Sequence, residues 1–354
     1  MEHYQITSII GPEAEDLLSH QCAKVPKETI FEPSSTILEK VFAQSDRSPE
    51  VVGNLHRLYH AGRLAGTGYL SVFPVDQAME HTAAYSFYKN PAYFDPETIV
   101  KVAYEGGCSG VASTLGVLGL MSKKYADKIP FVLKLNHNEL LTYPTTYDQI
   151  PFASVEQAKN LGAAGVGATI YFGSDESDKQ IVQVSRLFAQ AHAQGLFTIL
   201  WCYPRNNQFS KDGTSYESAV DISAQANHIG VTIEADIIKQ KIPTAQRGFK
   251  DISFAKWEDG MYDALMTDHP IDLVRYQVLH GYAGKIPLIN SGGESEGDAD
   301  NDFRSALRTA IINKRGGGSG LVMGRKVFKH DIAHGIELLH AVQDVYLDPE
   351  ITVA

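Results

Sequence analysis

The fold is decided by three consecutive segments: GVGATIYF (Gly165–Phe172), the helix-like Glu176–Gln194 and FTILWCY (Phe197–Tyr203). The first and third are short and mostly apolar or β-branched, which is typical of parallel strands buried on both faces. In the middle segment, apolar residues recur with the period of an α-helix, and Gly195 follows where a C-terminal cap is expected. The stretch therefore predicts a strand–helix–strand unit.

The same alternation extends along most of the chain. Eight strand-like runs are spaced widely enough for a covering helix after each: Tyr69–Asp76, Ser109–Thr114, Phe131–Asn136, Gly165–Phe172, Phe197–Tyr203, Ala235–Lys241, Pro287–Ser291 and Gly320–Arg325. This order predicts an α/β fold, a single (β/α)8 TIM barrel. The alternative is a doubly wound open sheet, but its usual GxGxxG motif is missing after the first strand.

The chain divides into a barrel and two flanking segments. Residues 1–68 predict an N-terminal extension of helices and loops that packs on the barrel, residues 69–347 the barrel itself, and residues 348–354 a C-terminal tail. The longest interval between strands contains an aromatic and charged insertion, 246–259, which is a candidate lid or interface. Three consecutive glycines, Gly316–Gly318, predict a flexible loop before the last strand.

The composition is that of an acidic globular protein. Its 354 residues include 31 Lys and Arg against 42 Asp and Glu, a net charge of −11 that argues against broad binding to nucleic acids. The three cysteines form no CxxC pair, so we expect reduced thiols. No apolar stretch is long enough to cross a membrane, and the N-terminus lacks the pattern of a secretory signal. We therefore expect a cytoplasmic protein with neither nucleic acid nor membrane as a partner.

Chemically active side chains gather at the carboxyl ends of the predicted strands, where barrel enzymes carry their active sites. Lys239 follows an apolar run, and burial lowers the pKa of a lysine. Strand alternation places Lys241 on the same face, and a second cation there would lower the pKa of Lys239 further. Lys239 is therefore a candidate nucleophile. The structural alternative is an ion pair with a carboxylate such as Asp76.

Two other strand ends carry further candidate residues. Lys134 is a second candidate nucleophile, and it could instead bind substrate or neutralise a carboxylate. Tyr203, next to Arg205, could act as a general acid or base, or it could be an aromatic residue at the rim with its hydroxyl in water. Trp201 shares the face of Tyr203 and could form a pocket wall or fill the core.

Two loops after the last two strands predict a phosphate site. Ser291, Gly292 and Gly293 follow the seventh strand, and Gly324 and Arg325 end the eighth. Glycines allow backbone amides to approach an anion closely, and arginine adds a planar charged fork. The loops after strands seven and eight are the usual phosphate site of barrel enzymes.

Metal ligands are poorly represented. His56 and His60 lie four apart on a probable helix but lack the glutamate of an HExxH motif. His137 and Glu139 have no third ligand nearby. We therefore expect no metal.

The chain resembles the archaeal-type class I fructose-bisphosphate aldolases, particularly their bacterial branch, from about Gly66 to the C-terminus. The motifs are PVDQAMEH (Pro74–His81), LKLNHNE (Leu133–Glu139), GATIYFGS (Gly167–Ser174), WCYPR (Trp201–Arg205), ADIIKQK (Ala235–Lys241), INSGG (Ile289–Gly293) and VMGRKVF (Val322–Phe328). Many archaeal members have His where Gln77 stands.

The resemblance implies a role for each matching residue. Lys239 forms the Schiff base, and Tyr203 is the proton donor and acceptor. Asp76 contacts the substrate, Trp201 lies beside it, and the two glycine loops bind phosphate. We also expect substrate or phosphate contacts from Lys134, Lys241, Arg205 and His81.

These expectations combine into a metal-independent class I aldolase that cleaves fructose 1,6-bisphosphate in glycolysis or gluconeogenesis. It would need no cofactor beyond a covalent Schiff base, and the family implies a homo-oligomer. One alternative is another Schiff-base carbon–carbon lyase or transferase that acts on a different phosphorylated ketose. A second is a sugar-phosphate-binding protein without turnover.

Overall fold

The computed structural model describes residues 1–77 and 79–354 and contains a closed barrel of eight parallel strands. In barrel order these are β1 (Leu70–Val75), β12 (Gly320–Val322), β11 (Leu288–Ser291), β10 (Ile237–Gln240), β7 (Phe197–Pro204), β6 (Gly165–Phe172), β3 (Phe131–Lys134) and β2 (Gly110–Ser113). Each of the eight predicted runs overlaps with one of these strands, and β7 extends one residue beyond its predicted end. The predicted TIM barrel is confirmed, and the open sheet is wrong.

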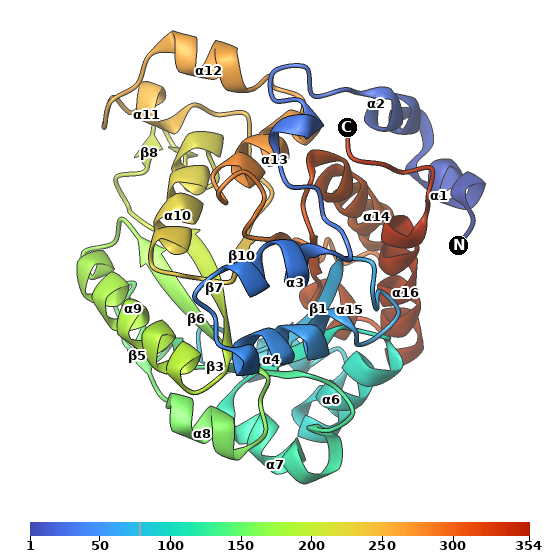
Figure 1. Cartoon of the computed structure of the whole chain (residues 1–354), viewed down its shortest axis with the longest axis vertical. Helices are drawn as coiled ribbons and strands as arrows, with labels where there is room; N and C mark the ends of the chain where they lie inside the picture. Colours follow the sequence, from blue (N-terminus) through green and yellow to red (C-terminus); the bar gives the residue numbers. More distant parts are fainter. Residues whose placement is uncertain (78) are drawn as a thin grey trace.

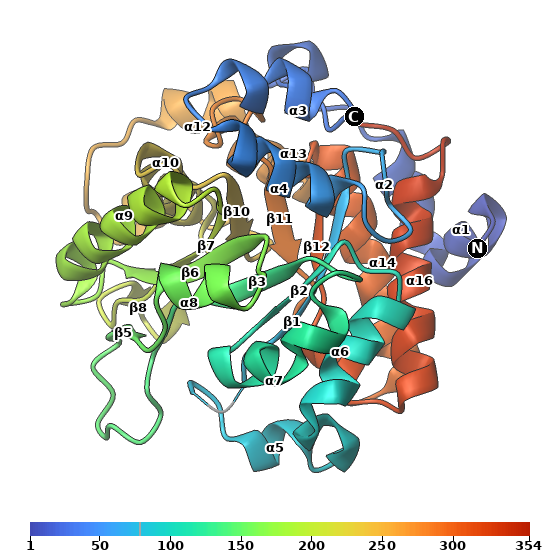
Figure 2. The same ribbon diagram turned by 60° about the horizontal axis from the view of Figure 1, so that its bottom comes forward.

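Helices cover the outside of the barrel (Figures 1 and 2). One helix after each barrel strand packs on this outside layer: α6 (Pro96–Glu105), α7 (Leu115–Tyr125), α8 (Val155–Asn160), α9 (Ser177–Ala193), α10 (Val220–Thr232), α13 (Pro270–Leu279), α14 (Ala299–Gly316) and α16 (Ile332–Leu347). On α9, Val184, Phe188 and Ala191 are buried, which confirms the apolar stripe predicted there. Gly195 has a φ of +82° and allows the chain to turn into β7.

Shorter elements lie in the connections. They are α5 (Ala83–Phe87), α11 (Gly248–Asp251), α12 (Asp259–Leu265), α15 (Arg325–Phe328) and two small hairpins, β4 (Asn136–His137) with β5 (Ile150–Pro151) and β8 (Ser210–Lys211) with β9 (Thr214–Ser215). The insertion at 246–259 includes α11, and Phe249 and Phe254 pack edge to face within it. Within the described residues, no helix is both long and apolar enough to cross a membrane.

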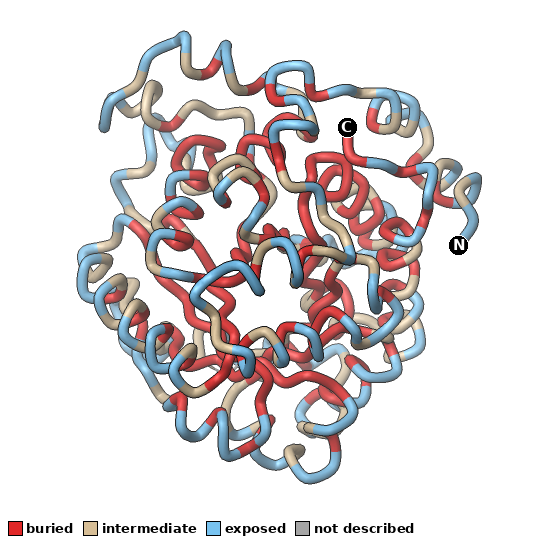
Figure 3. The backbone as a smooth tube through the Cα atoms, in the orientation of Figure 1, coloured by how far each residue is buried: buried red, intermediate tan, exposed pale blue. Residues whose placement is uncertain are grey.

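The N-terminal extension closes one end of the barrel. It contains α1 (His3–Ile10), α2 (Ala14–Ser19), α3 (Ile37–Lys40) and α4 (Pro49–Tyr59). Leu55 and Leu58 of α4 are fully buried, in one cluster with the strand residues Val72, Ile199 and Ile237. Buried residues are concentrated toward the centre of the molecule and exposed ones along its outer helices and loops (Figure 3). The amide of Asn54 donates to Gly195 O at 2.7 Å, immediately before β7. This contact places α4 at the amino ends of the strands, opposite the expected active site.

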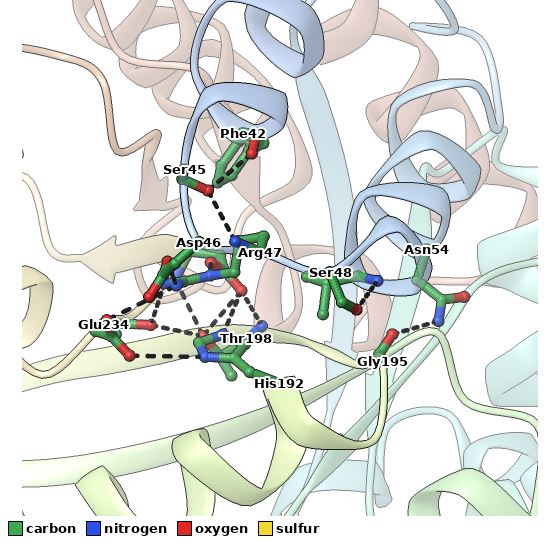
Figure 4. A network of polar contacts seen from close by, with 12 residues as sticks. Phe42, Ser45, Asp46, Arg47, Ser48, Asn54, His192, Gly195, Thr198 and Glu234 are labelled. Carbon is green, nitrogen blue, oxygen red and sulfur yellow. Dashed lines mark hydrogen bonds and ion pairs between the residues drawn. The ribbon is translucent and has the colours of Figure 1, made fainter.

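A buried ion-pair network fixes this closure (Figure 4). The fully buried carboxylate of Asp236, just before β10, accepts from Arg47 Nε at 2.6 Å. It also accepts from Thr198 N and from His192 Nε2, both at 2.9 Å. Since the donors come from the extension, from α9 and from β7, the network joins three parts of the chain.

The glycine triplet before β12 is rigidly packed, so the predicted flexible loop is wrong. Gly316, Gly317 and Gly318 are buried, and Gly317 caps α14 with a φ of +90°. A Cβ at Gly318 would lie 2.0 Å from the Asn313 amide nitrogen. Ala354 is buried nearby, where its carbonyl accepts from Arg275 at 2.7 Å.

Candidate active site

A polar pocket opens at the carboxyl ends of the barrel strands. It is lined by Pro74, Asp76, Gln77, Glu80, His81, His137, Thr169, Trp201, Tyr203, Arg205, Lys239, Lys241, Ser291, Gly293, Glu294, Val322, Gly324 and Arg325. Most residues singled out from the sequence therefore meet in one place. Two of them, Lys134 and Gly292, are buried and do not line the pocket.

Lys239 projects from β10 into this pocket and is only 5% exposed. Burial lowers the pKa of Lys239 to about 7, against the opposing effect of Asp76, and nearby Arg325, Lys134 and Lys241 lower it further. The Nζ atom lies 4.4 Å from the centre of the Tyr203 ring. The environment therefore favours the neutral amine of Lys239 far more than water does.

Lys134 is more deeply enclosed. It is fully buried, its Nζ donates to Thr169 Oγ1 at 2.5 Å, and the same atom lies 3.9 Å from Asp76 Oδ2. Burial lowers the pKa of Lys134 to about 8, opposed by the carboxylates of Asp76 and Glu80. Its Nζ also lies 4.3 Å from the centre of the Trp201 ring. Lys134 thus lies next to the pocket without lining it, and its ammonium group already has Thr169 and Asp76 as partners.

Asp76 follows β1 and has a partner that the sequence did not indicate. Its Oδ2 accepts from His137 Nε2 at 3.0 Å. Burial alone would raise the pKa of Asp76, but His137, Lys134 and Lys239 together hold it well below its usual range. Asp76 is therefore an ionised carboxylate that accepts a hydrogen bond from His137 and interacts electrostatically with Lys134 and Lys239.

His137 lies in the pocket and not in the metal pair considered from the sequence. Its Nδ1 is 3.6 Å from Glu80 Oε2, and the hydroxyl of Tyr171 donates to the other oxygen of Glu80. Glu139 faces away, and its carboxylate accepts from the Thr142 hydroxyl at 2.6 Å. His137, Glu80 and Tyr171 are among the site residues to which the sequence analysis gave no role in this pocket.

Potential metal ligands occur elsewhere in the described residues. Two groups have ligand atoms within 4.8 Å of one another: His20 with Cys22 and Asp272, and His3 with Asp348 and Glu350. Neither group lines the pocket.

One wall of the pocket is aromatic and cationic. The Arg205 guanidinium lies 5.5 Å from the centre of the Tyr171 ring and 5.6 Å from that of Tyr203. Its Nη1 donates to Glu217 at 2.7 Å. Burial and the neighbouring Arg205 lower the pKa of Lys241, whose Nζ lies 5.9 Å from the Tyr203 ring. This wall can attract an anionic ligand.

The glycine loops after β11 and β12 approach each other closely. A Cβ at Gly292 would lie 2.0 Å from Met323 Sδ, and one at Gly324 would lie 2.8 Å from Pro74 O. Gly293 has a φ of +84°, which favours glycine. A side chain at any of these three positions would therefore clash or strain the backbone, and the Gly292 amide already donates to Val322 O at 3.0 Å. Gly293 and Gly324 line the pocket, where backbone amides without a side chain suit an anion.

Two cations flank the glycine loops. Arg325 pairs through Nη1 with Glu294 Oε1 at 2.5 Å near the surface. Lys326 is 3% exposed, and its Nζ lies 3.9 Å from the position that a Cβ on Gly293 would occupy. The sequence analysis did not assign Lys326, because it lies beyond the last predicted strand, in α15.

The comparisons with known proteins agree with this geometry. A family model described as "DeoC/LacD family aldolase" matches residues 70–330. A Chlamydia pneumoniae protein named "Probable fructose-bisphosphate aldolase class 1" is 55% identical over 349 residues, 99% of both chains. A Methanocaldococcus jannaschii protein named "Fructose-bisphosphate aldolase/6-deoxy-5-ketofructose 1-phosphate synthase" is 31% identical over 313 residues, 86% of this chain and 88% of its own.

A solved structure supports the same conclusion. The crystal structure of an archaeal fructose 1,6-bisphosphate aldolase has a TM-score of 0.63 and 25% identity, and it covers 82% of this chain and 99% of its own. The barrel, the sequence matches and the family model together show that the chain belongs to the DeoC/LacD family of aldolases.

Proposed function

We propose that the chain is a class I fructose-bisphosphate aldolase, which reversibly cleaves fructose 1,6-bisphosphate into dihydroxyacetone phosphate and glyceraldehyde 3-phosphate. The observation that carries this proposal is the buried Lys239, whose pKa is lowered to about 7 at the end of a barrel strand. The similarity of almost the whole chain to a relative named as a probable enzyme of this class supports the choice of substrate.

The reaction begins with attack of the neutral Lys239 amine on the C2 carbonyl of the sugar. A C–N bond forms, the carbonyl oxygen takes up a proton, and loss of water from the carbinolamine leaves an iminium ion. Lys239 suits this role better than Lys134, since Lys239 lines the pocket and has the lower pKa.

Cleavage uses the iminium ion as an electron sink. A base removes the C4 hydroxyl proton, the C3–C4 bond breaks, and its electron pair forms an enamine while glyceraldehyde 3-phosphate leaves. The enamine is then protonated at C3, and water releases dihydroxyacetone phosphate from Lys239. We assign part of this proton transfer to Tyr203 because its ring lies beside the Lys239 amine. We assign the orientation of substrate hydroxyls to Asp76.

Binding of the phosphate groups holds the sugar in register for this chemistry. We assign one phosphate to Ser291 and Gly293 of the first glycine loop with Gly324 and Arg325 of the second, all of which line the pocket. Gly292, also expected there, keeps the two loops close, since its amide donates to Val322 O. Arg205, Lys241 and His81 line the pocket and are available to the rest of the substrate. The covalent intermediate requires no metal or organic cofactor. We expect a cytoplasmic homo-oligomer that acts in glycolysis or gluconeogenesis.

A second candidate function is transfer of the same enamine to a different aldehyde. The Methanocaldococcus relative, whose name gives two activities, favours this alternative. Both candidates share Lys239, so the identity of the aldehyde distinguishes them.

A direct assay tests the proposal. Purified protein with fructose 1,6-bisphosphate should release both triose phosphates in the presence of EDTA, and Lys239→Met should abolish release without loss of helical circular dichroism. Activity that EDTA removes and zinc restores would contradict a Schiff-base enzyme.

A further inference from the structure

His137 occupies an unusual position between two carboxylates of the pocket. Its Nε2 faces Asp76 Oδ2 at 3.0 Å, and its Nδ1 faces Glu80 Oε2 at 3.6 Å. The side chain is about 5% exposed, and Nδ1 has no hydrogen-bond partner within the described residues. Burial of a ring nitrogen without a hydrogen-bond partner costs free energy. This cost points to a role for His137 in the site.

Hydrogen bonds hold the Glu80 side of this arrangement in place. The Tyr171 hydroxyl donates to Glu80, and the Tyr171 amide donates to Gln180 Oε1 at 2.8 Å. Leu140 N donates to Met79 O at 2.8 Å and thereby ties the segment after β4 to the loop that carries Glu80. His137 is consequently held from both sides, by β6 through Glu80 and by its own hairpin.

On the other side, Asp76 connects His137 to Lys239, the proposed nucleophile. The charged groups that face Asp76 are His137 from β4, Lys134 from β3 and Lys239 from β10. Lys134 is 3.9 Å from Asp76 Oδ2, too far for a direct hydrogen bond. Within the part of the chain that the structure describes, His137 is therefore the side chain that donates a hydrogen bond to Asp76 and sets the direction of its carboxylate.

We propose that His137 is a positioning residue of the reaction: its Nε2–H holds the Asp76 carboxylate in place beside Lys239, while the Glu80 carboxylate, bound by Tyr171, faces the other ring nitrogen. This role rests on the proposed aldolase function and adds to it. His137 acts through Asp76, so its loss should slow turnover more than it weakens substrate binding.

A matched pair of substitutions tests the proposal. In His137→Gln the amide nitrogen can reach the position of Nε2 and still donate to Asp76. In His137→Asn the shorter amide reaches only the position of Nδ1. We expect kcat to fall about 10- to 100-fold in His137→Asn, as for loss of a hydrogen bond to a charged group. It should stay within about 5-fold in His137→Gln, and KM should change little in both.

The pH dependence of kcat provides a readout that a purely structural role would not move. His137 contributes to the low pKa of Asp76, so its removal raises that pKa and Asp76 is protonated at higher pH. The fall of kcat on acidification should therefore begin at higher pH in His137→Asn than in the wild type. His137→Gln should resemble the wild type. We use kcat because it reports groups in the enzyme–substrate complex, after Lys239 has reacted.

The outcomes separate this inference from the proposed function. Borohydride should trap dihydroxyacetone phosphate on Lys239 in the wild type and in both variants. Equal loss of kcat in the two variants, or unchanged pH profiles, would overturn the role of His137 while trapping persists. Absence of any wild-type adduct would overturn the proposed function and this role with it.

Discussion

The amine of Lys239 lies 4.4 Å from the centre of the Tyr203 ring, and the two residues come from the neighbouring strands β10 and β7. The register of these strands is fixed by backbone pairing, with Lys239 opposite Trp201. A group that can form a bond to a ketone and a group that can move a proton are thus held together by rigid elements. Such placement reduces the entropy cost of reaching the reactive geometry.

Replacement of Asp76 by Asn should have different effects on adduct formation at Lys239 and on turnover. The Asp76 carboxylate raises the pKa of Lys239 from the lower value that burial alone would give, so its loss should lower that pKa. The amine is then neutral at lower pH, and the acid limb of borohydride trapping should move downward. Turnover should still fall because substrate hydroxyls lose their partner. An upward move of that limb would contradict the assigned electrostatics.

Replacement of Lys241 by Met should have the opposite effect on trapping. Lys241 is one of three cations that lower the pKa of Lys239, after Arg325 and Lys134. Without it, the pKa of Lys239 should rise modestly, and the acid limb of trapping should shift to higher pH. The adduct itself should persist. Complete loss of trapping in a folded Lys241→Met protein would show that Lys241, not Lys239, is the nucleophile.

Substitutions at Arg325 and Glu294 should change phosphate binding in opposite directions. Arg325→Ala removes a charged donor and should raise KM for fructose 1,6-bisphosphate about 10-fold or more. A bound phosphate must compete with Glu294 for Arg325, and such a surface pair is worth about 1 kcal/mol at most. Glu294→Gln should therefore lower KM by up to about 5-fold. Inhibition by inorganic phosphate should follow the same order, and no change in either variant would remove Arg325 from the phosphate site.

The free energy of unfolding should depend on the ion-pair network around Asp236, at the amino ends of the barrel strands. Arg47→Met removes the guanidinium that is 2.6 Å from the fully buried Asp236, and loss of one partner of a buried pair costs about 3 kcal/mol. Asp46→Asn is the control, since Asp46 pairs with the same Arg47 but is 71% exposed. It should cost less than about 1 kcal/mol. Urea unfolding measures both, and similar losses would contradict the network's importance. Turnover should stay at the wild-type level.

The strand pattern allowed the barrel to be predicted, because a parallel strand buried on both faces is apolar throughout its length. The strand ends also identified most pocket residues, since a charge such as Lys239 after an apolar run is rare without a role. The prediction of a flexible loop at Gly316–Gly318 was wrong for a physical reason. The glycines there are required by close packing against Asn313 and by a left-handed helix cap at Gly317, not by mobility.

His137 could not be placed from strand alternation. Counting from Lys134 by twos leads to Asn136 on the inner face and sends His137 outward. In the structure β3 ends at Lys134, Asn136 bonds the backbone of Thr169, and the small hairpin β4–β5 turns the chain. His137 therefore enters the pocket through a contact between segments far apart in sequence. Its partner Glu80 lies in an irregular loop, for which a single sequence offers no periodic signal.

The central claim is that Lys239 forms the covalent bond to the substrate. The most direct test is borohydride reduction in the presence of dihydroxyacetone phosphate, followed by digestion and mass spectrometry of the peptides. The account predicts a reduced adduct on the peptide that contains Lys239, and none in a folded Lys239→Met protein. An adduct on Lys134 or Lys241, with Lys239→Met still active, would contradict it.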